Sequence, residues 1–310
     1  MRTTRLTAGL LATTVALLAA ACGGSNASDD ARTVLATTTT TATEGTTGPV
    51  ERPTSPVDQL IAVDGGRMHL RCVGSGPTTV LLIAGWGDGG ETWGSIEPAV
   101  AERARVCSYA RFGTGTSDPQ TATQTFATRA TDLHALMEAA GEPGPYVVVG
   151  HSFGGAEAVT FAAQHADEVV GLMLLDASPV TWPETACSVV DDGSEAARNL
   201  RQGCTVMHDP TLDPERLDAF AAFREVGAIT SLGDLPMTVM SAAERTLPGL
   251  SQDERDRLSA VWDDGVAQWA ALSTSSSVVT VQDTGHHIQL DQPDLVIEQL
   301  VALLPGHASS

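Results

Sequence analysis

Short apolar runs rich in β-branched residues recur along the chain from about residue 57, and glycine, proline or polar residues bound most of them. Runs of roughly four to eight such residues are typical of strands that are buried on both faces of a sheet. On this basis, strands are predicted at residues 60–63, 68–73, 79–84, 106–110, 146–150, 169–175, 237–241 and 278–282.

Stretches with apolar residues at helical spacing separate most of these runs. Helices are predicted at residues 92–103, 125–140, 155–165, 252–272 and 293–303. Opening strands followed by strand–helix alternation are typical of α/β proteins. We therefore expect a mostly parallel, doubly wound sheet of about eight strands with helices on both faces.

Residues 178–234 interrupt this alternation. They carry many turn residues, a short helical pattern at 213–223 and the apolar side chains of Trp182, Met207 and Phe220. The segment is predicted to be a cap inserted between two strands. Its composition fits a substrate-contacting lid as well as a long excursion with a small core of its own.

The first 57 residues differ in composition from the rest. Arg2 and Arg5 precede an apolar stretch at 10–21 that is too short to span a bilayer, so residues 1–21 are predicted to be a secretory signal peptide. Residues 22–57 are rich in threonine and poor in apolar side chains, which predicts a disordered tether. One globular domain is expected at residues 58–310.

The end of the signal peptide and the residues after it read Leu-Ala-Ala-Ala-Cys-Gly-Gly-Ser, residues 18–25, which resembles the lipobox of bacterial lipoproteins. The resemblance implies a lipid anchor on Cys22. Ala19 stands where that motif prefers a branched aliphatic residue, so the alternative is ordinary cleavage with Cys22 left as a thiol. In both cases we expect an exported protein, anchored at the outer face of the cell membrane or secreted.

The chain is strongly acidic, with 17 basic residues, 38 acidic residues and a net charge of −21. Removal of Arg2 and Arg5 with the signal peptide leaves a charge of about −23, which repels nucleic acid and anionic membranes. We therefore expect no nucleic-acid partner, and no membrane attachment except through a lipid. All basic residues are arginine, which excludes a Schiff-base lysine and a P-loop lysine.

Four cysteines follow Cys22, namely Cys72, Cys107, Cys187 and Cys204. In an exported chain an even number indicates two disulfides, with three possible connectivities. No Cys-x-x-Cys spacing occurs, which argues against a zinc site. We predict no metal and no cofactor.

Residues 146–156, Tyr-Val-Val-Val-Gly-His-Ser-Phe-Gly-Gly-Ala, combine a buried-strand pattern, a Gly-x-Ser-x-Gly motif and the start of a helical pattern. Gly150 and Gly154 remove side chains where the chain folds back, so Ser152 can adopt a strained conformation with its hydroxyl exposed. The alternative is a glycine-rich connector without chemistry. The strand before the motif and the helix after it favour a nucleophile elbow.

Three other segments resemble motifs of the α/β-hydrolase family, in the family's order. Residues 84–88, Ala-Gly-Trp-Gly-Asp, are similar to its His-Gly-x loop with alanine in place of the histidine. Residues 109–117 are similar to its Tyr-Asp-x-x-Gly-x-Gly-x-Ser motif, but Ala110 replaces an aspartate that supports the loop. Residues 284–293 look like its Gly-His loop. The resemblance extends from residue 60 to residue 304 and implies the α/β-hydrolase fold.

In this family the serine, the acid and the histidine follow one another along the chain in that order. The resemblance implies Ser152 as the nucleophile and His286 as the base, because His286 directly follows a glycine and the side chain of His287 points the other way. The acid is predicted to be Asp176, which ends the strand at 169–175. Glu244, after the strand at 237–241, is the alternative.

The resemblance also implies two backbone N–H donors for the oxyanion that forms during acyl transfer. They are the amides of Phe153, which follows the nucleophile, and of Trp86, in the loop after the third strand. In the family's sheet order the second and fourth strands are neighbours, which implies a disulfide between Cys72 and Cys107. Cys187 and Cys204, close together in a polar stretch, are expected to form the second.

These residues predict a serine hydrolase that cleaves the carboxylic ester of a small molecule through an acyl-enzyme. Amide, thioester and lactone hydrolysis, peptide hydrolysis, perhydrolysis and acyl transfer would use the same residues. A serine nucleophile argues against the dehalogenase and epoxide-hydrolase branches of the family, which use aspartate. The alternative from another class is a ligand-binding protein on a hydrolase scaffold.

Overall fold

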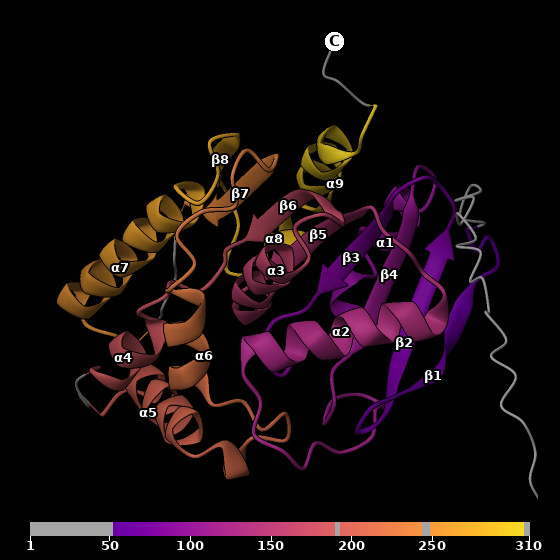
Figure 1. Ribbon diagram of the computed structural model, residues 1–310. Coiled ribbons are helices and arrows are strands. Elements are labelled where there is room, and N and C mark those ends of the chain that lie inside the picture. The colour runs from indigo at the N-terminus through magenta and orange to yellow at the C-terminus, as the bar shows by residue number, and fades with distance from the viewer. Residues whose placement is uncertain (1–51, 190–192, 244–248, 307–310) are drawn as a thin grey trace, which may run out of the picture. The chain divides into compact units, whose positions relative to one another are not determined.

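A computed structural model of the protein describes residues 52–189, 193–243 and 249–306 (Figure 1). The predicted signal peptide, Cys22, most of the predicted tether and Glu244 lie outside these residues. Among the helices within them, none is both long and apolar enough to cross a membrane.

The centre of the domain is one eight-stranded sheet with the strand order β1-β2-β4-β3-β5-β6-β7-β8. The first two strand pairs, β1 with β2 and β2 with β4, are antiparallel, and the remaining pairs are parallel. The strands are β1 (Val57–Val63), β2 (Gly66–Gly74), β3 (Thr79–Ile83), β4 (Arg105–Ala110), β5 (Tyr146–His151), β6 (Val169–Leu175), β7 (Met237–Ala242) and β8 (Ser276–Val281). The predicted fold class is confirmed.

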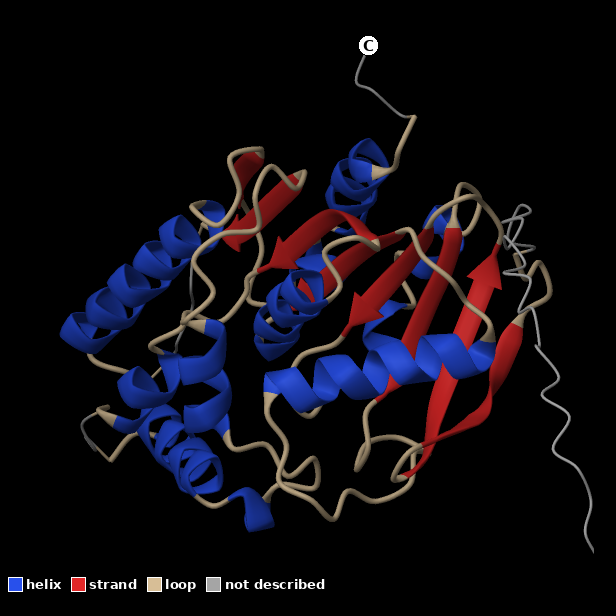
Figure 2. Ribbon diagram, in the orientation of Figure 1, coloured by secondary structure: helices blue, strands red, loops and turns tan. Residues whose placement is uncertain are grey.

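Helices cover both faces of this sheet (Figure 2). One face packs against α2 (Phe126–Ala140), α3 (Phe153–Gln164) and α7 (Gln252–Ala270), and the other against α1 (Glu97–Val100), α8 (Ile288–Asp291) and α9 (Pro293–Leu303). Successive side chains of β3 alternate between the two faces: Leu81 packs in the first core and Leu82 in the second. Burial on both faces explains why the central strands are continuous apolar runs.

The helix predicted at 92–103 is wrong in its extent. The structure has a short 3₁₀ helix, η1 (Gly90–Trp93), and then α1, which begins at Glu97 and has Pro98 in its first turn. Proline has no backbone N–H and its ring clashes with the preceding turn, so a helix can begin at Pro98 but cannot continue through it.

The predicted cap segment, residues 178–234, lies between β6 and β7 and is mostly helical. It contains α4 (Trp182–Cys187), α5 (Glu195–His208), the 3₁₀ helix η2 (Pro210–Leu212) and α6 (Ala219–Val226). The helical pattern at 213–223 is a correct prediction only from Ala219 onward. Before it, Asp213 accepts backbone N–H bonds from Glu215 and Leu217, and this side-chain bonding holds a turn in place of a helix.

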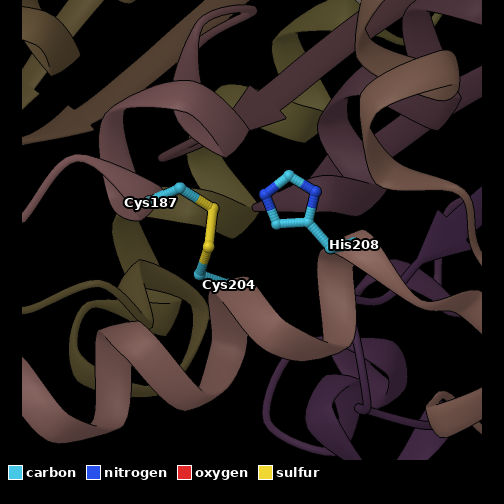
Figure 3. Close-up of side chains that lie close together, drawn as sticks. All are labelled: Cys187, Cys204 and His208. Carbon is cyan, nitrogen blue, oxygen red and sulfur yellow. A yellow bond between two sulfur atoms is a disulfide. The ribbon is translucent and has the colours of Figure 1, made fainter.

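Both predicted disulfides are confirmed. Cys72 and Cys107 are directly opposite each other in the register of β2 and β4 and are bonded. Cys187, at the end of α4, is bonded to Cys204 in α5, beside the ring of His208 (Figure 3). The second bond therefore ties together two helices of the cap segment.

Candidate active site

Ser152 occupies a sharp turn between β5 and α3. Its backbone has φ 55° and ψ −125°, a conformation that side-chain-bearing residues rarely adopt. The flanking glycines make this turn possible, because a Cβ on Gly150 would lie 2.3 Å from the carbonyl oxygen of Gly154, and a Cβ on Gly154 would lie 2.3 Å from that of Ala84. The serine is therefore held at the end of a buried strand, immediately before a helix.

His286 lies between Ser152 and Asp176. Its Nε2 is 2.9 Å from the hydroxyl oxygen of Ser152, and its Nδ1 is 2.7 Å from a carboxylate oxygen of Asp176. A carboxylate only accepts hydrogen bonds, so Nδ1 carries the proton and the lone pair of Nε2 faces the serine. The structure thus brings together three side chains from β6, the elbow and the loop after β8.

Asp176 is almost fully buried, with 1% of its surface exposed, and two elements fix its position. Its backbone N–H bonds to the carbonyl of Met240, and its second carboxylate oxygen accepts the N–H of Ala242 at 3.2 Å. Its φ of 40° turns the chain out of β6. This residue ends an apolar strand at the carboxyl edge of a parallel sheet, where ligand sites of such sheets form.

Trp86 and Phe153 lie side by side. Their rings are stacked, with centroids 5.2 Å apart, and the indole N–H of Trp86 donates to Asp213 at 3.1 Å. Phe153 is the first residue of α3, where a backbone N–H has no acceptor within the helix. The loop after β3 and the helix start therefore meet next to Ser152.

A buried arginine holds the loop after β3. Arg111 donates to the carbonyl oxygens of Ala84, at 2.9 Å, and of Gly85. Its Nε donates to the carboxylate of Glu215 at 2.6 Å. Ala110 stands where the family has a supporting aspartate, and the next residue, Arg111, braces the neighbouring loop after β3.

Glu215 connects this loop to the cap segment. Its other carboxylate oxygen accepts the backbone N–H of Gly87 at 2.7 Å, and the oxygen that bonds Arg111 also lies 2.9 Å from a guanidinium nitrogen of Arg129. Burial acts to raise the pKa of Glu215, but the guanidinium groups of Arg111 and Arg129 outweigh it and hold the pKa below its usual range. Sequence reasoning missed this residue, because a single glutamate in a polar loop carries no periodic signal.

His151, the variable residue of the elbow motif, is another group that the sequence did not single out. It is 1% exposed, and its Nε2 donates to the backbone carbonyl of His286 at 2.9 Å. Burial, together with nearby His286, lowers the pKa of His151 to about 3, so the ring is neutral. The ring of His287 also lies next to that of His151, with centroids 4.9 Å apart, and its Nε2 is 3.8 Å from a carboxylate oxygen of Asp88.

Comparison with known proteins links this geometry to a family. Residues 78–225 match the family model described as alpha/beta hydrolase fold. YqjL of Bacillus subtilis is 25% identical over 77% of this chain and 89% of its own length. The lipase LipV of Mycobacterium tuberculosis is 34% identical, but the match covers 49% of this chain and 60% of the lipase.

Solved structures share the fold. One is carboxylesterase CesB of Bacillus subtilis, which superposes with a TM-score of 0.56 at 15% identity. The match covers 82% of this chain and 93% of the esterase. At this level of identity the likeness is evidence for the fold, and the chemistry has to be argued from the site itself.

Proposed function

Because this chain belongs to the α/β-hydrolase fold family, we propose that it is a serine hydrolase that cleaves the carboxylic ester of a small molecule. The observation that carries the proposal is the hydrogen-bonded chain from Ser152 through His286 to Asp176. A serine hydroxyl is a weak nucleophile at neutral pH, and a neighbouring imidazole in this tautomer can take its proton.

In the first half-reaction the oxygen of Ser152 attacks the ester carbonyl carbon while His286 Nε2 accepts the hydroxyl proton. The buried carboxylate of Asp176 stabilises the imidazolium that forms. His286 then gives the proton to the leaving alkoxide, so that an alcohol departs and an acyl-enzyme remains. In the second half-reaction, His286 takes a proton from water, which attacks the acyl carbon, and then returns this proton to the oxygen of Ser152 as the carboxylic acid leaves.

The negative oxygen of each tetrahedral intermediate needs hydrogen-bond donors. We assign this role to the backbone N–H groups of Phe153 and Trp86, and each such donor is worth roughly 3 kcal/mol in related sites. The stacking of the two side chains and the bonds from Arg111 to the loop after β3 support this assignment, because both fix the backbone around the donors. The side chains of Trp86 and Phe153 would form part of the acyl pocket.

We also propose that the protein is exported and attached to the membrane by a lipid on Cys22. The support is the apolar segment at 10–21 and the lipobox-like residues that follow it. Metabolic labelling with a radioactive fatty acid tests this: wild type should incorporate label, and Cys22→Ser should not. Label in Cys22→Ser would contradict the anchor.

Turnover of p-nitrophenyl esters of increasing acyl length tests the proposed reaction. Ser152→Ala should lose a factor of roughly 10⁴ to 10⁶ in kcat and keep its fold, because it removes a single oxygen from a turn. Asp118→Asn, at an exposed ion pair with Arg67, is the control and should keep wild-type kcat. Residual activity above about a thousandth of wild type in Ser152→Ala would contradict the assignment.

A further inference from the structure

Three side chains that are far apart in the sequence converge beside the elbow. Asp88 comes from the loop after β3, His151 from the elbow and His287 from the loop after β8. A carboxylate oxygen of Asp88 is 4.0 Å from His151 Nδ1 and 3.8 Å from His287 Nε2, and the three atoms all lie within 4.8 Å of one another. A Cβ on Gly85 would lie 3.0 Å from the Asp88 oxygen and 3.1 Å from His151 Nδ1, so the backbone closes this space on one side.

The orientation of the His151 ring leaves a buried lone pair. Its Nε2 must carry the proton, because Nε2 bonds to the carbonyl oxygen of His286, which only accepts. Nδ1 is therefore an acceptor, and no donor within the described residues bonds to it. It faces the carboxylate of Asp88, which is also an acceptor. The Asp88 side chain is 35% exposed, but this nitrogen of His151 is buried, and a buried acceptor that faces another acceptor is unfavourable unless a cation or a proton donor lies between them.

We propose that Asp88, His151 and His287 bind a zinc ion. Two imidazole nitrogens and one carboxylate oxygen form a three-residue ligand set that zinc uses, with a fourth position open to water. Neutral imidazole and carboxylate donors also fit the preferences of this metal better than those of calcium or magnesium, which take oxygen ligands. This proposal does not depend on the proposed hydrolase activity.

The distances allow such a site after a small adjustment. With metal–ligand bonds of about 2.0–2.2 Å in a tetrahedron, ligand atoms lie roughly 3.3–3.6 Å from one another. The present separations, 3.8 Å, 4.0 Å and at most 4.8 Å, are longer by a few tenths of an ångström up to about 1.5 Å. The side chains of Asp88 and His287 are 35% and 44% exposed and can rotate, whereas His151 is fixed by burial.

Other groups of potential ligands fit a metal less well. Cys187 and Cys204, beside His208, are joined in a disulfide and offer no thiolate (Figure 3). His134 and His165 lie near Glu168, but their rings stack at 3.9 Å with an interplanar angle of 5°. Lone pairs in the planes of two parallel rings do not converge on one ion.

Isothermal titration of the intact, chelator-treated protein with zinc chloride tests the site. We expect one zinc ion per chain, and a decrease in affinity of at least about tenfold in both Asp88→Asn and His287→Gln, substitutions that keep side-chain size at partly exposed positions. His165→Ala is the matched control and should bind like wild type. Circular dichroism melts verify that each variant is folded.

Three results would overturn the proposal. They are no zinc binding by wild type, wild-type affinity in both folded Asp88 and His287 variants, or loss of binding in His165→Ala. Because the readout is heat of binding, a failure here leaves the proposed esterase activity untouched, and an inactive enzyme would leave this site untouched.

Discussion

The two oxygens of Asp176 have different partners, the imidazole of His286 and the backbone N–H of Ala242. In Asp176→Asn an amide NH₂ can face His286 Nδ1, which then accepts, so the proton moves to Nε2 and the ring can no longer take the serine proton. We expect kcat for a p-nitrophenyl ester to fall on the order of 10⁴-fold. The surface substitution Asp118→Asn should leave kcat unchanged. A loss of less than about tenfold in Asp176→Asn would move the acid elsewhere, with Glu244 the next candidate.

Asp132 allows the pH dependence of the free energy of unfolding to be tested at a single residue. Burial, with the negative charges of Glu157 and Asp64, raises the pKa of Asp132 to about 6, from 3.8 in the unfolded chain. The folded state therefore holds this proton more tightly, and the free energy of unfolding falls as pH rises from about 4 to about 6. Asp132→Asn should remove this loss and stabilise the protein at pH 8, on the order of 1 kcal/mol after allowance for solvent screening.

Urea unfolding at pH 4.5 and pH 8 measures this effect, and the gain should be smaller at pH 4.5. Asp118→Asn is the control, because the pKa of Asp118 is shifted in the opposite direction to that of Asp132. A hydrogen bond from Arg67 lowers the pKa of Asp118, so its contribution to stability is present above its unfolded pKa and is lost as pH falls through the lower folded value. Asp118→Asn should therefore not stabilise at pH 8. Equal effects of Asp132→Asn at both pH values would show that the residue is not titrating as described.

At the scale of elements, the junction between the cap segment and the loop after β3 depends on Glu215. Arg111 and Arg129 are buried with it, at 5% and 4% exposure, so removing its charge leaves two buried guanidinium groups beside a single carboxylate, that of Glu157. Glu215→Gln should lower the free energy of unfolding by about 3–5 kcal/mol, as expected for one partner of a buried ion pair. Breaking the exposed Arg67–Asp118 pair with Asp118→Asn should cost far less, because water screens this pair.

Chemical denaturation of both variants measures this difference. If Glu215→Gln stays folded, its kcat should also fall, because the N–H of Gly87 and the carbonyls held by Arg111 belong to the loop that carries Trp86. Equal stability losses in the two variants would contradict the role of Glu215 as the buried link between the cap segment and this loop.

Helices and strands were predicted best where a local sequence feature, such as an apolar run or a proline, determines their bounds. The strand at 169–175 is an unbroken apolar run, and β6 has these bounds in the structure. Proline at 98 was a readable stop signal inside the helix predicted at 92–103. Helix α5 (Glu195–His208) was missed because most of its residues are polar and it packs through few apolar positions, with Ala197 and Met207 buried.

At the scale of the whole molecule, the order of motifs predicted the sheet, and the sheet brings Ser152, Asp176 and His286 to one edge. What the sequence could not predict are contacts between segments that share no pattern. Arg111 and Glu215 are 104 residues apart, and their bond depends on how the cap segment folds back. The approach of Asp88 to His151 similarly follows from how the loop after β3 lies against the end of β5, which no spacing in the chain encodes.

The most direct test of the central claim, a serine hydrolase with Ser152 as its nucleophile, is covalent labelling by a fluorophosphonate followed by peptide mass spectrometry. Folded wild type should carry one adduct, on the hydroxyl of Ser152, and His286→Ala should label far more slowly because the serine has lost its base. Folded wild-type protein that stays unlabelled, or that carries the adduct on another residue, would contradict the claim and favour a ligand-binding protein on a hydrolase scaffold.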